Sequence, residues 1–423
     1  MKKWFLIFAA QLIAIALCKA QSTNSLSISD CYKLAEQNYP LVKRYDLIKK
    51  TADYSLENLQ KGYLPQFAVS AQASYQSAVT SIPIRLPGVE IPVLSKDQYK
   101  AYAEVDQVLY DGGEIARQKD LQKSNETVSQ QQLASDLYQL KDRINQLFFG
   151  VLLIDEQLKQ NDLLAKDLQL GLDKTQASVK NGTAFRSNAD LISAELLQTK
   201  QQAIELQASR KAYTDMLSLF IGKPVDEDAA LAIPQQVTVS NEIKRPELAV
   251  FDAEGKGLDV QNQLLTVNTL PKLSLFLQGG YGRPGLDALD NNFAGYYLGG
   301  IHLSWSPSVF YTLKKKRAQI DINRQELAVQ KETFLFNTNL TVKQQSSEIS
   351  KYQRLSASDD EIIALREKVK TAAMAQLENG VITGNDFLKE VNDEDQAKQN
   401  KLLHSIQLLM AQYNQQTTTG NQP

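Results

Sequence analysis

Long heptad segments without proline restrict the folds that are open to this chain. No proline occurs from Gly112 to Lys180, and a helix of about 70 residues would extend roughly 100 Å at 1.5 Å per residue. Apolar residues recur there at alternating spacings of four and three, the 3.5-residue period of a coiled-coil seam. Ordinary globular cores do not need helices of this length. The seam runs through Leu133, Leu137, Leu140, Ile144, Leu147, Val151, Ile154 and Leu158.

A second segment, 192–220, follows the same period, with Arg210 interrupting it. Asn181-Gly182 lies between the two segments and suits a tight reversal, so we expect an antiparallel helix hairpin. The second half of the chain should form another hairpin with less regular seams. Its helices are expected at about 313–377 and 385–415.

Charge and cysteine usage exclude several classes of protein. The 46 Lys and Arg residues nearly balance the 48 Asp and Glu residues, and the formal net charge of −2 does not favour nucleic acid. The only long apolar run, 4–17, is too short for a comfortable membrane helix. Two cysteines and two histidines leave little for disulfides, metal sites or acid–base chemistry. We therefore expect no enzyme activity, no cofactor and no metal.

Residues 1–20 have the layout of a secretory signal peptide, with a basic start, an apolar stretch and a small residue, Ala20, before the expected cleavage site. Cys18 raises the alternative of a lipoprotein signal, but Leu17 stands where such signals usually carry a small residue. We predict cleavage after Ala20 and export from the cytoplasm. Cys31 is then a lone thiol.

The chain carries an internal duplication. A helix-like segment, a Leu-Pro pair, two alternating segments, a very long helix and a closing helix occur twice in the same order. On this basis the chain divides into a signal peptide (1–20), a first repeat (21–230), a linker (231–245), a second repeat (246–416) and a disordered tail (417–423). The matched positions are Pro40, Leu64, Pro65 and Tyr75 in the first half and Pro246, Leu270, Pro271 and Tyr281 in the second.

Each half contains two segments that alternate apolar and polar residues over about ten to twelve positions. That length suits a tilted strand crossing a bilayer, with one face toward lipid. The same alternation would also suit amphipathic hairpins packed on a soluble core. The residues expected to face lipid are Phe67, Val69, Tyr75, Leu273, Leu275, Leu277, Tyr297, Ile301, Leu303 and Trp305.

If these strands span a membrane, oligomerisation is a physical requirement. Four strands cannot close a barrel, and open strand edges are not tolerated in lipid because their backbone groups stay unpaired. Three copies would supply twelve strands. The predicted class is therefore an α+β membrane protein, with long antiparallel coiled-coil helices and four β-strands per chain in a shared 12-stranded barrel.

In these features together, the chain resembles the TolC-type outer-membrane efflux proteins of Gram-negative bacteria over essentially its whole mature length. The duplicated order of segments and the two hairpin turns match that family. So do Leu64-Pro65 and Leu270-Pro271 before the strands, and Leu109-Tyr110-Asp111-Gly112-Gly113 where a strand enters a long helix.

The resemblance implies a homotrimer in the outer membrane, with a periplasmic α-barrel whose closed tip opens like an iris. It also implies a periplasmic adaptor and an inner-membrane pump of the resistance-nodulation-division or ABC type. Small molecules would be conducted passively, with the free energy supplied by the pump. Outer-membrane lipid would surround the barrel, and no nucleic acid is implied.

The resemblance also implies functional positions at the hairpin tips. The family often carries a carboxylate six residues after the second turn glycine, which here is Asp386, and some members carry another where this chain has Lys389. The matching position in the first hairpin is Asn188, with Asp190 nearby. The alternative interpretation is that these are solvated helix-start residues. Adaptor docking is expected at Asn181, Gly182, Thr183 and Ala184, and at Asn379, Gly380, Val381, Ile382 and Thr383.

Two other functions stay open. The chain could be the outer-membrane duct of a type I protein secretion system, which belongs to the same class. It could instead be a soluble periplasmic coiled-coil adaptor or scaffold. Such adaptors normally carry one central hairpin, so the duplicated strands argue against this second alternative.

Overall fold

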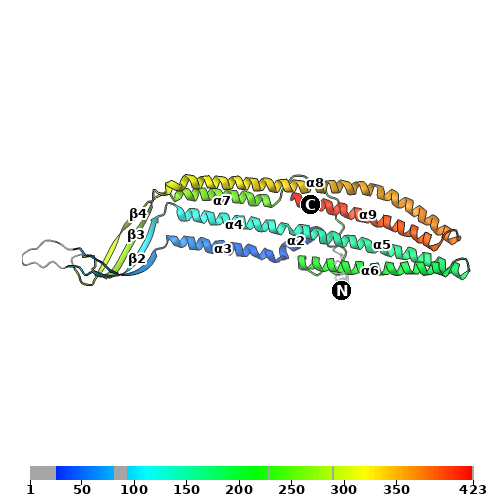
Figure 1. Ribbon diagram of the computed structural model, residues 1–423, viewed down its shortest axis with the longest axis horizontal. Helices are drawn as coiled ribbons and strands as arrows, with labels where there is room; N and C mark the ends of the chain where they lie inside the picture. The colour runs from blue at the N-terminus through cyan, green and yellow to red at the C-terminus, as the bar shows by residue number, and fades with distance from the viewer. Residues whose placement is uncertain (1–24, 81–92, 227–228, 288–289, 422–423) are drawn as a thin grey trace, which may run out of the picture. The chain divides into compact units, whose positions relative to one another are not determined.

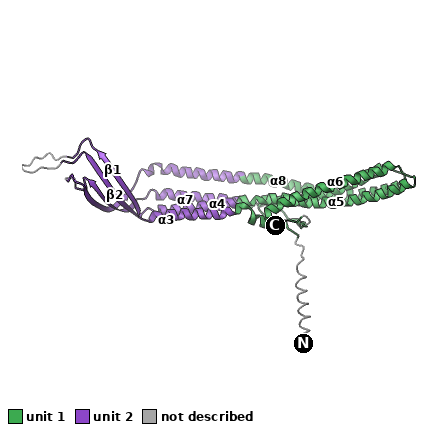
Figure 2. Cartoon of the chain, turned by 90° about the horizontal axis from the view of Figure 1, so that it is seen from below, with its two compact units in different colours: residues 1–42, 135–246, 334–423 green, residues 43–134, 247–333 purple. Residues whose placement is uncertain are grey.

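The computed structural model describes residues 25–80, 93–226, 229–287 and 290–421. The predicted signal peptide, with Cys18, lies outside these residues. The chain divides into two compact units (Figure 2). Unit 1 holds residues 1–42, 135–246 and 334–423, and unit 2 holds 43–134 and 247–333. Each unit takes segments from both predicted repeats. Two helices, α4 (Glu114–Tyr138) and α8 (Val309–Glu378), contribute residues to both units.

Unit 2 contains an antiparallel sheet in which the strands lie in chain order, β1-β2-β3-β4 (Figure 1). All four predicted strands are present. The pairing of β2 with β3 joins a strand of the first half to one of the second. β1 and β4 form the edges, and the described residues supply no further strand to either edge. The strands are β1 (Gln66–Tyr75), β2 (Asp97–Tyr110), β3 (Lys272–Arg283) and β4 (Ala294–Ser304).

The Asp-Gly-Gly motif explains how β2 gives way to α4. Gly112 and Gly113 have φ values of 71° and 84°, a left-handed conformation that strains any residue with a Cβ. A Cβ on Gly112 would also lie 3.0 Å from the Cβ of Leu270. Asp111 accepts hydrogen bonds from the backbone N–H groups of Gly113 and Ile115, both at 2.8 Å. The carboxylate thus caps the first turn of α4.

The helical part of unit 2 consists of α3 (Arg44–Gln60), α7 (Glu247–Val267), most of α4 and the first part of α8. Ion pairs connect α7 to α8, between Asp259 and Arg324 and, at 2.9 Å, between Asp252 and Lys331. Within the described chain, no helix combines the length and apolarity needed to cross a membrane.

Unit 1 is built from two helix hairpins and the short helix α2 (Ile28–Asn38). The first hairpin is α5 (Leu140–Lys180) with α6 (Arg186–Ile221), and the second is the end of α8 with α9 (Gly384–Thr419) (Figure 1). The prediction of one continuous helix across 112–180 is wrong at Gln139, which separates α4 from α5. Gln139 keeps right-handed helical angles (φ −63°, ψ −16°), so only the helical hydrogen bonding is interrupted.

Cys31 lies on α2 and is fully buried as a free thiol. Burial raises its pKa to about 12. Because the thiolate is the reactive form of cysteine, this residue acts as a small apolar side chain.

The predicted coiled-coil seam forms the core of the first hairpin. The ring of Tyr213 on α6 packs directly against Gly150 on α5. A Cβ at position 150 would lie 2.5 Å from this ring. Arg210 interrupts the apolar period, and it is satisfied by an ion pair with Asp155 of α5 and a 2.9 Å hydrogen bond to the Ala229 carbonyl. The buried seam residues include Leu140, Ile144, Leu147, Val151, Ile154, Ile192, Leu196 and Leu217.

The segment 231–245, predicted as a linker, is tied to α9. Gln415 donates to the Asn241 side chain at 3.2 Å, and the Lys244 N–H donates to the Thr419 carbonyl at 2.6 Å. Thr419 is fully buried and is the last residue of α9, and Gly420, whose φ is 84°, caps the helix. Residues 417–419 are therefore helical, where the sequence predicts the start of a disordered tail.

Near the turns, one apolar cluster joins the two hairpins. Phe387 of α9 is fully buried, and its ring lies against α5 where a Cβ on Gly171 would be 2.8 Å away. Close packing of this kind holds the hairpins together without an intervening polar group. The cluster contains Leu164, Leu168, Leu172, Ala189, Ile192, Leu196, Ala373, Phe387, Leu388 and Val391.

Replacing Phe387 with alanine should destabilise unit 1 by about 3–5 kcal/mol, because it removes a fully buried ring and leaves a cavity between the hairpins. Phe185→Ala is the matched control, since Phe185 is 81% exposed, and its effect should stay within about 0.5 kcal/mol. Thermal unfolding followed by circular dichroism measures both. Equal melting temperatures for the two variants would contradict this account of the core.

Candidate functional site

The strand register brings the predicted lipid-facing residues to one face of the sheet. Residues paired directly across antiparallel strands project to the same face. Phe67 pairs with Val105, Val105 pairs with Leu277, and Leu275 pairs with Ile301. We call this side the apolar sheet face. It carries Phe67, Val69, Tyr75, Leu273, Leu275, Leu277, Tyr297, Ile301 and Leu303, and Trp305 directly follows β4.

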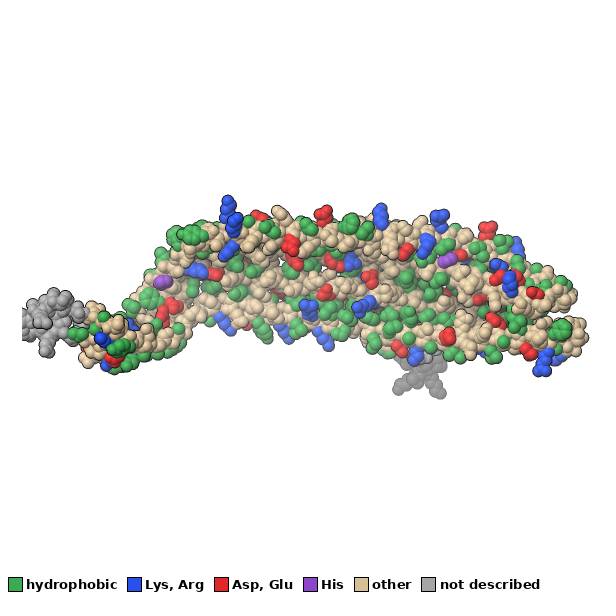
Figure 3. All heavy atoms as spheres, viewed as in Figure 1, with side chains coloured by type: hydrophobic (Ala, Val, Ile, Leu, Met, Phe, Trp, Pro, Cys, Tyr) green, Lys and Arg blue, Asp and Glu red, His purple; other side chains and the backbone are tan. Residues whose placement is uncertain are grey.

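The apolar sheet face is exposed in the single chain. Tyr297 is 82% exposed, and of the predicted set only Leu273 is half-buried. Figure 3 likewise shows hydrophobic side chains reaching the surface over strands and helices. The opposite face of the sheet is polar, with Lys100, Glu104 and His302 among its residues. An exposed apolar surface that is continuous over several strands is typical of an interaction site.

One end of the apolar sheet face carries an aromatic cluster that the sequence does not predict. Arg283 pairs with Asp97, and its guanidinium lies 5.5 Å from the Tyr99 ring centre and 5.2 Å from that of Phe293. Phe293 also stacks on Tyr281, with ring centres 5.7 Å apart. These residues are far apart in sequence, so only the pairing of β2 with β3 reveals the cluster.

Both hairpin turns use the same helix-ending geometry. After α5, Gly182 has a φ of 73°, and the Thr183 N–H donates to the Ser178 carbonyl at 2.9 Å. After α8, Gly380 has a φ of 69°, and the Val381 N–H donates to a carbonyl of the last turn at 2.8 Å. This is the Schellman arrangement, in which glycine supplies the left-handed residue. The turns are therefore defined by local sequence.

The predicted docking residues lie in these turns and are mostly exposed. Ala184 and Ile382 are half-buried, while Val381 is 70% exposed and Phe185, next to the first turn, is also exposed. Each turn thus presents one exposed apolar side chain among polar ones. The full predicted set is Asn181, Gly182, Thr183, Ala184, Asn379, Gly380, Val381, Ile382 and Thr383.

Asp386 forms a capping box at the start of α9. Its carboxylate accepts hydrogen bonds from the Thr383 backbone N–H at 3.0 Å and the Thr383 hydroxyl at 2.7 Å, while its own N–H donates to that hydroxyl at 3.3 Å. These hydrogen bonds, the one from the Thr383 side chain first, hold the pKa of Asp386 below its ordinary value. Asp386 is exposed, so the cap leaves it accessible to solvent.

The other residues predicted to act at the hairpin tips, Lys389, Asn188 and Asp190, have different surroundings. Lys389 does not bond to Asp386 but pairs with Glu390 at 3.2 Å and Asp393 at 3.5 Å, and the hydrogen bond and charge of Glu390 raise its pKa. Asn188 is half-buried against α9. A Cβ at Gly384 of α9 would lie 3.1 Å from the Cβ of Asn188. Asp190 is exposed on α6.

A layer of polar side chains, some buried and some partly exposed, adjoins the apolar cluster, and the sequence does not predict it. Lys370 of α8 pairs with Asp167 of α5 at 2.8 Å and with Glu394 of α9 at 3.2 Å. Asp395 accepts a 2.8 Å hydrogen bond from Gln160 of α5, and burial raises its pKa. The layer connects both hairpins. The sequence signal that could have predicted this layer is the presence of charged residues on an otherwise apolar helix face.

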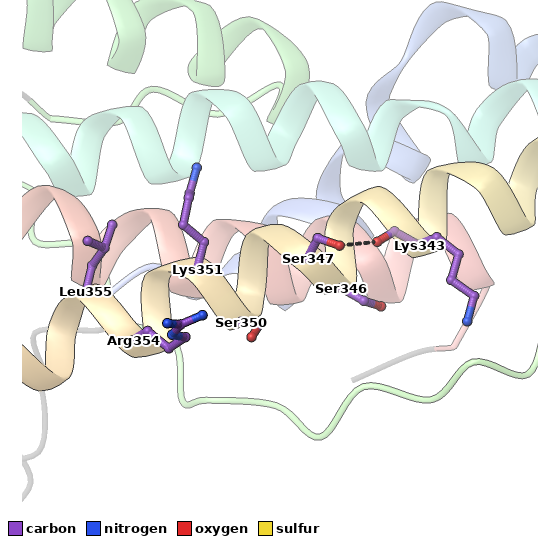
Figure 4. A pocket seen from close by; sticks show the side chains of 7 residues that line it. All are labelled: Lys343, Ser346, Ser347, Ser350, Lys351, Arg354 and Leu355. Atoms are coloured by element: carbon purple, nitrogen blue, oxygen red, sulfur yellow. Dashed lines mark hydrogen bonds between the residues drawn. The ribbon is translucent and has the colours of Figure 1, made fainter.

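No group of three or more His, Cys, Asp or Glu side chains among the described residues could hold a metal ion. One surface depression is lined only by α8 residues, Lys343, Ser346, Ser347, Ser350, Lys351, Arg354 and Leu355 (Figure 4). Because no second element contributes a group, it does not form a converging ligand site.

Comparison with solved structures finds this architecture in outer-membrane channels. The outer-membrane channel OprN matches with a TM-score of 0.67 at 13% identity, over 93% of this chain and 90% of OprN. CusC matches with a TM-score of 0.68 at 12% identity, over 93% and 92%. The MtrE outer membrane channel of Neisseria gonorrhoeae matches with a TM-score of 0.65 at 14% identity, over 94% and 91%. The chain has the fold of an outer-membrane channel.

At these identities the likeness establishes the fold, and at that level it confirms the resemblance to TolC-type outer-membrane efflux proteins. No model of a known protein family and no curated protein sequence matches the chain.

The capping box predicts that the stability of the first turn of α9 depends on pH. Because the pKa of Asp386 is lowered in the folded chain, its contribution is present above the ordinary carboxyl pKa of about 4 and is lost as the pH falls through the lowered value. Amide protection in the first turn of α9 should therefore decrease in acid, as measured by hydrogen exchange corrected for intrinsic rates.

Asp386→Asn should remove this pH dependence, whereas Asp190→Asn, which changes an exposed carboxylate outside the cap, should leave it intact. Thr383→Ala should reduce protection at every pH, since it removes the N-cap hydroxyl. If Asp386→Asn lost protection in acid to the same extent as the native chain, the capping box would not control this turn.

Proposed function

We propose that this chain is the protomer of an outer-membrane efflux channel that conducts small molecules passively to the cell exterior. The observation that carries the proposal is the apolar sheet face, which is continuous across four strands, exposed, and backed by a polar face. Lipid on one side and water on the other would stabilise such a sheet. The fold shared with OprN, CusC and MtrE supports the same function.

The proposed assembly is a trimer with a 12-stranded barrel. Within the described residues, β1 and β4 each have one edge without a strand partner. Lipid cannot satisfy such edges, so β1 of one copy would pair with β4 of the next. The long helices of three copies would continue the duct as a periplasmic α-barrel.

The hairpin tips are the proposed periplasmic gate and adaptor contact. Asp386 and Lys389 lie in the first turns of α9, and Asn188 and Asp190 lie in the first turns of α6. Dilation of the tips would widen an iris made by three copies. The two turns, with exposed Phe185 and Val381, would dock a periplasmic adaptor, which delivers cargo from an inner-membrane pump of the resistance-nodulation-division or ABC type.

The trimer is tested in membranes of expressing cells by fractionation and by gel migration with and without boiling. We expect the chain in the outer-membrane fraction, migrating near three chains unboiled and near one chain boiled, because barrels closed between chains resist detergent. Purified trimers should then conduct in planar bilayers. A soluble periplasmic monomer would overturn the proposal and favour the soluble scaffold.

The gate is tested by Asp386→Cys. If three copies of this position converge at the tip, mild oxidation should cross-link chains and reduce the conductance of the purified trimer, and reduction should restore it. Cys31 is buried and should not compete. Lys180→Cys, at the exposed end of α5, is the control. Equal cross-linking of both variants would argue against a constriction at Asp386.

A further inference from the structure

Three consecutive lysines near the start of α8 have no role in the duct described so far. Lys314, Lys315 and Lys316 are all exposed, and they form no ion pair or hydrogen bond with any residue that the structure describes. We call them the lysine triplet. Some cations of unit 2 do have acidic partners, in the pairs Lys272–Glu114, Arg324–Asp259 and Lys331–Asp252.

Exposed aromatic rings precede the lysine triplet by one helical turn. Phe310 is exposed, and Tyr311 is 86% exposed. Residues four apart share a helix face. Phe310 therefore lies one turn before Lys314 on the same face of α8, and Tyr311 lies one turn before Lys315. At 1.5 Å per residue, the lysines begin about 6 Å farther along α8 than the rings. The order along this helix is therefore aromatic first and cationic second.

The same order continues from the apolar sheet face. Ile301 and Leu303 belong to that face on β4. Trp305 follows, more than half exposed, with its indole N–H donating to the Thr269 carbonyl at 3.0 Å. Along the chain, the surface thus changes from aliphatic to aromatic to basic.

We propose that the lysine triplet binds the anionic headgroups of phospholipids in the leaflet facing the helices. This inference rests on the proposed membrane function of the apolar sheet face. A bilayer presents hydrocarbon, then an interfacial zone that favours Trp and Tyr, then charged headgroups, and this surface presents their complements in the same order. Lysine stems lie along apolar surface while the ammonium groups reach phosphate. The absence of acidic partners among the described residues leaves the three charges available for lipid.

The test measures lipid binding to the full-length protein, purified in a non-ionic detergent, by native mass spectrometry. Phosphatidylglycerol is titrated against phosphatidylcholine with the same acyl chains. The native chain should prefer phosphatidylglycerol, and Lys314→Gln/Lys315→Gln/Lys316→Gln should weaken that binding about tenfold or more, since each basic residue near an anionic surface contributes measurably. Added inorganic phosphate should not compete, because the apolar and aromatic zones bind the rest of the lipid.

Two matched variants separate charge from position. Lys314→Arg/Lys315→Arg/Lys316→Arg should keep the preference, because it keeps the charge. Lys43→Gln/Lys49→Gln/Lys50→Gln, which removes three exposed lysines at and near the start of α3, should also keep it. An unchanged preference in the Gln triplet at 314–316, or full competition by inorganic phosphate, would overturn the proposal.

The outcome is separable from that of the proposed function. Each protein is first checked for outer-membrane fractionation and for trimer migration without boiling. A native chain that fails this check contradicts the channel itself. A chain that passes, yet binds both lipids equally, contradicts only the headgroup site.

Discussion

Unpaired strand edges govern how the sheet of this protein can exist in water or in lipid. β1 and β4 each present one row of backbone N–H and C=O groups without a strand partner among the described residues. In water such edges promote association, and in lipid they are not tolerated. Together with the exposed apolar sheet face, they make a lone chain an incomplete structure. The proposed trimer closes the edges with further copies of the same strands.

The two hairpins of unit 1 are held together by different kinds of contact. α5 and α6 join through a regular apolar seam, whereas α8 and α9 join through apolar contacts, such as Ile349 with Leu408, and also through ion pairs, such as Arg366 with Asp393 at 2.8 Å. Apolar seams gain from close packing, while partly exposed ion pairs contribute little net stability and exchange readily with water. The ion pairs of the second seam would rearrange more readily than apolar packing, which suits the proposed gate at the hairpin tips.

Sequence reasoning succeeded where the determinants are local and failed where they are not. The turns at Gly182 and Gly380 were predicted because glycine and its neighbours close a helix without outside help. The break at Gln139 was missed, since no proline or glycine marks it. Nor did alternation reveal the irregularity in β2, where Tyr110 rather than Leu109 pairs with Leu273. An extra residue in a strand is defined by its partner strand, not by its own sequence.

Local signals in the sequence define the elements. The heptad spacing predicts the long helices, the period-two alternation predicts the strands, and the Asn-Gly pairs predict the reversals. Each signal arises within one segment, because backbone geometry and side-chain direction repeat over a few residues. Only the tertiary structure decided which segments meet. It paired β2 with β3, gathered Arg283 and Phe293, and placed Lys370 between Asp167 and Glu394. Such contacts join residues far apart in the chain, so their energies depend on packing that no single segment encodes.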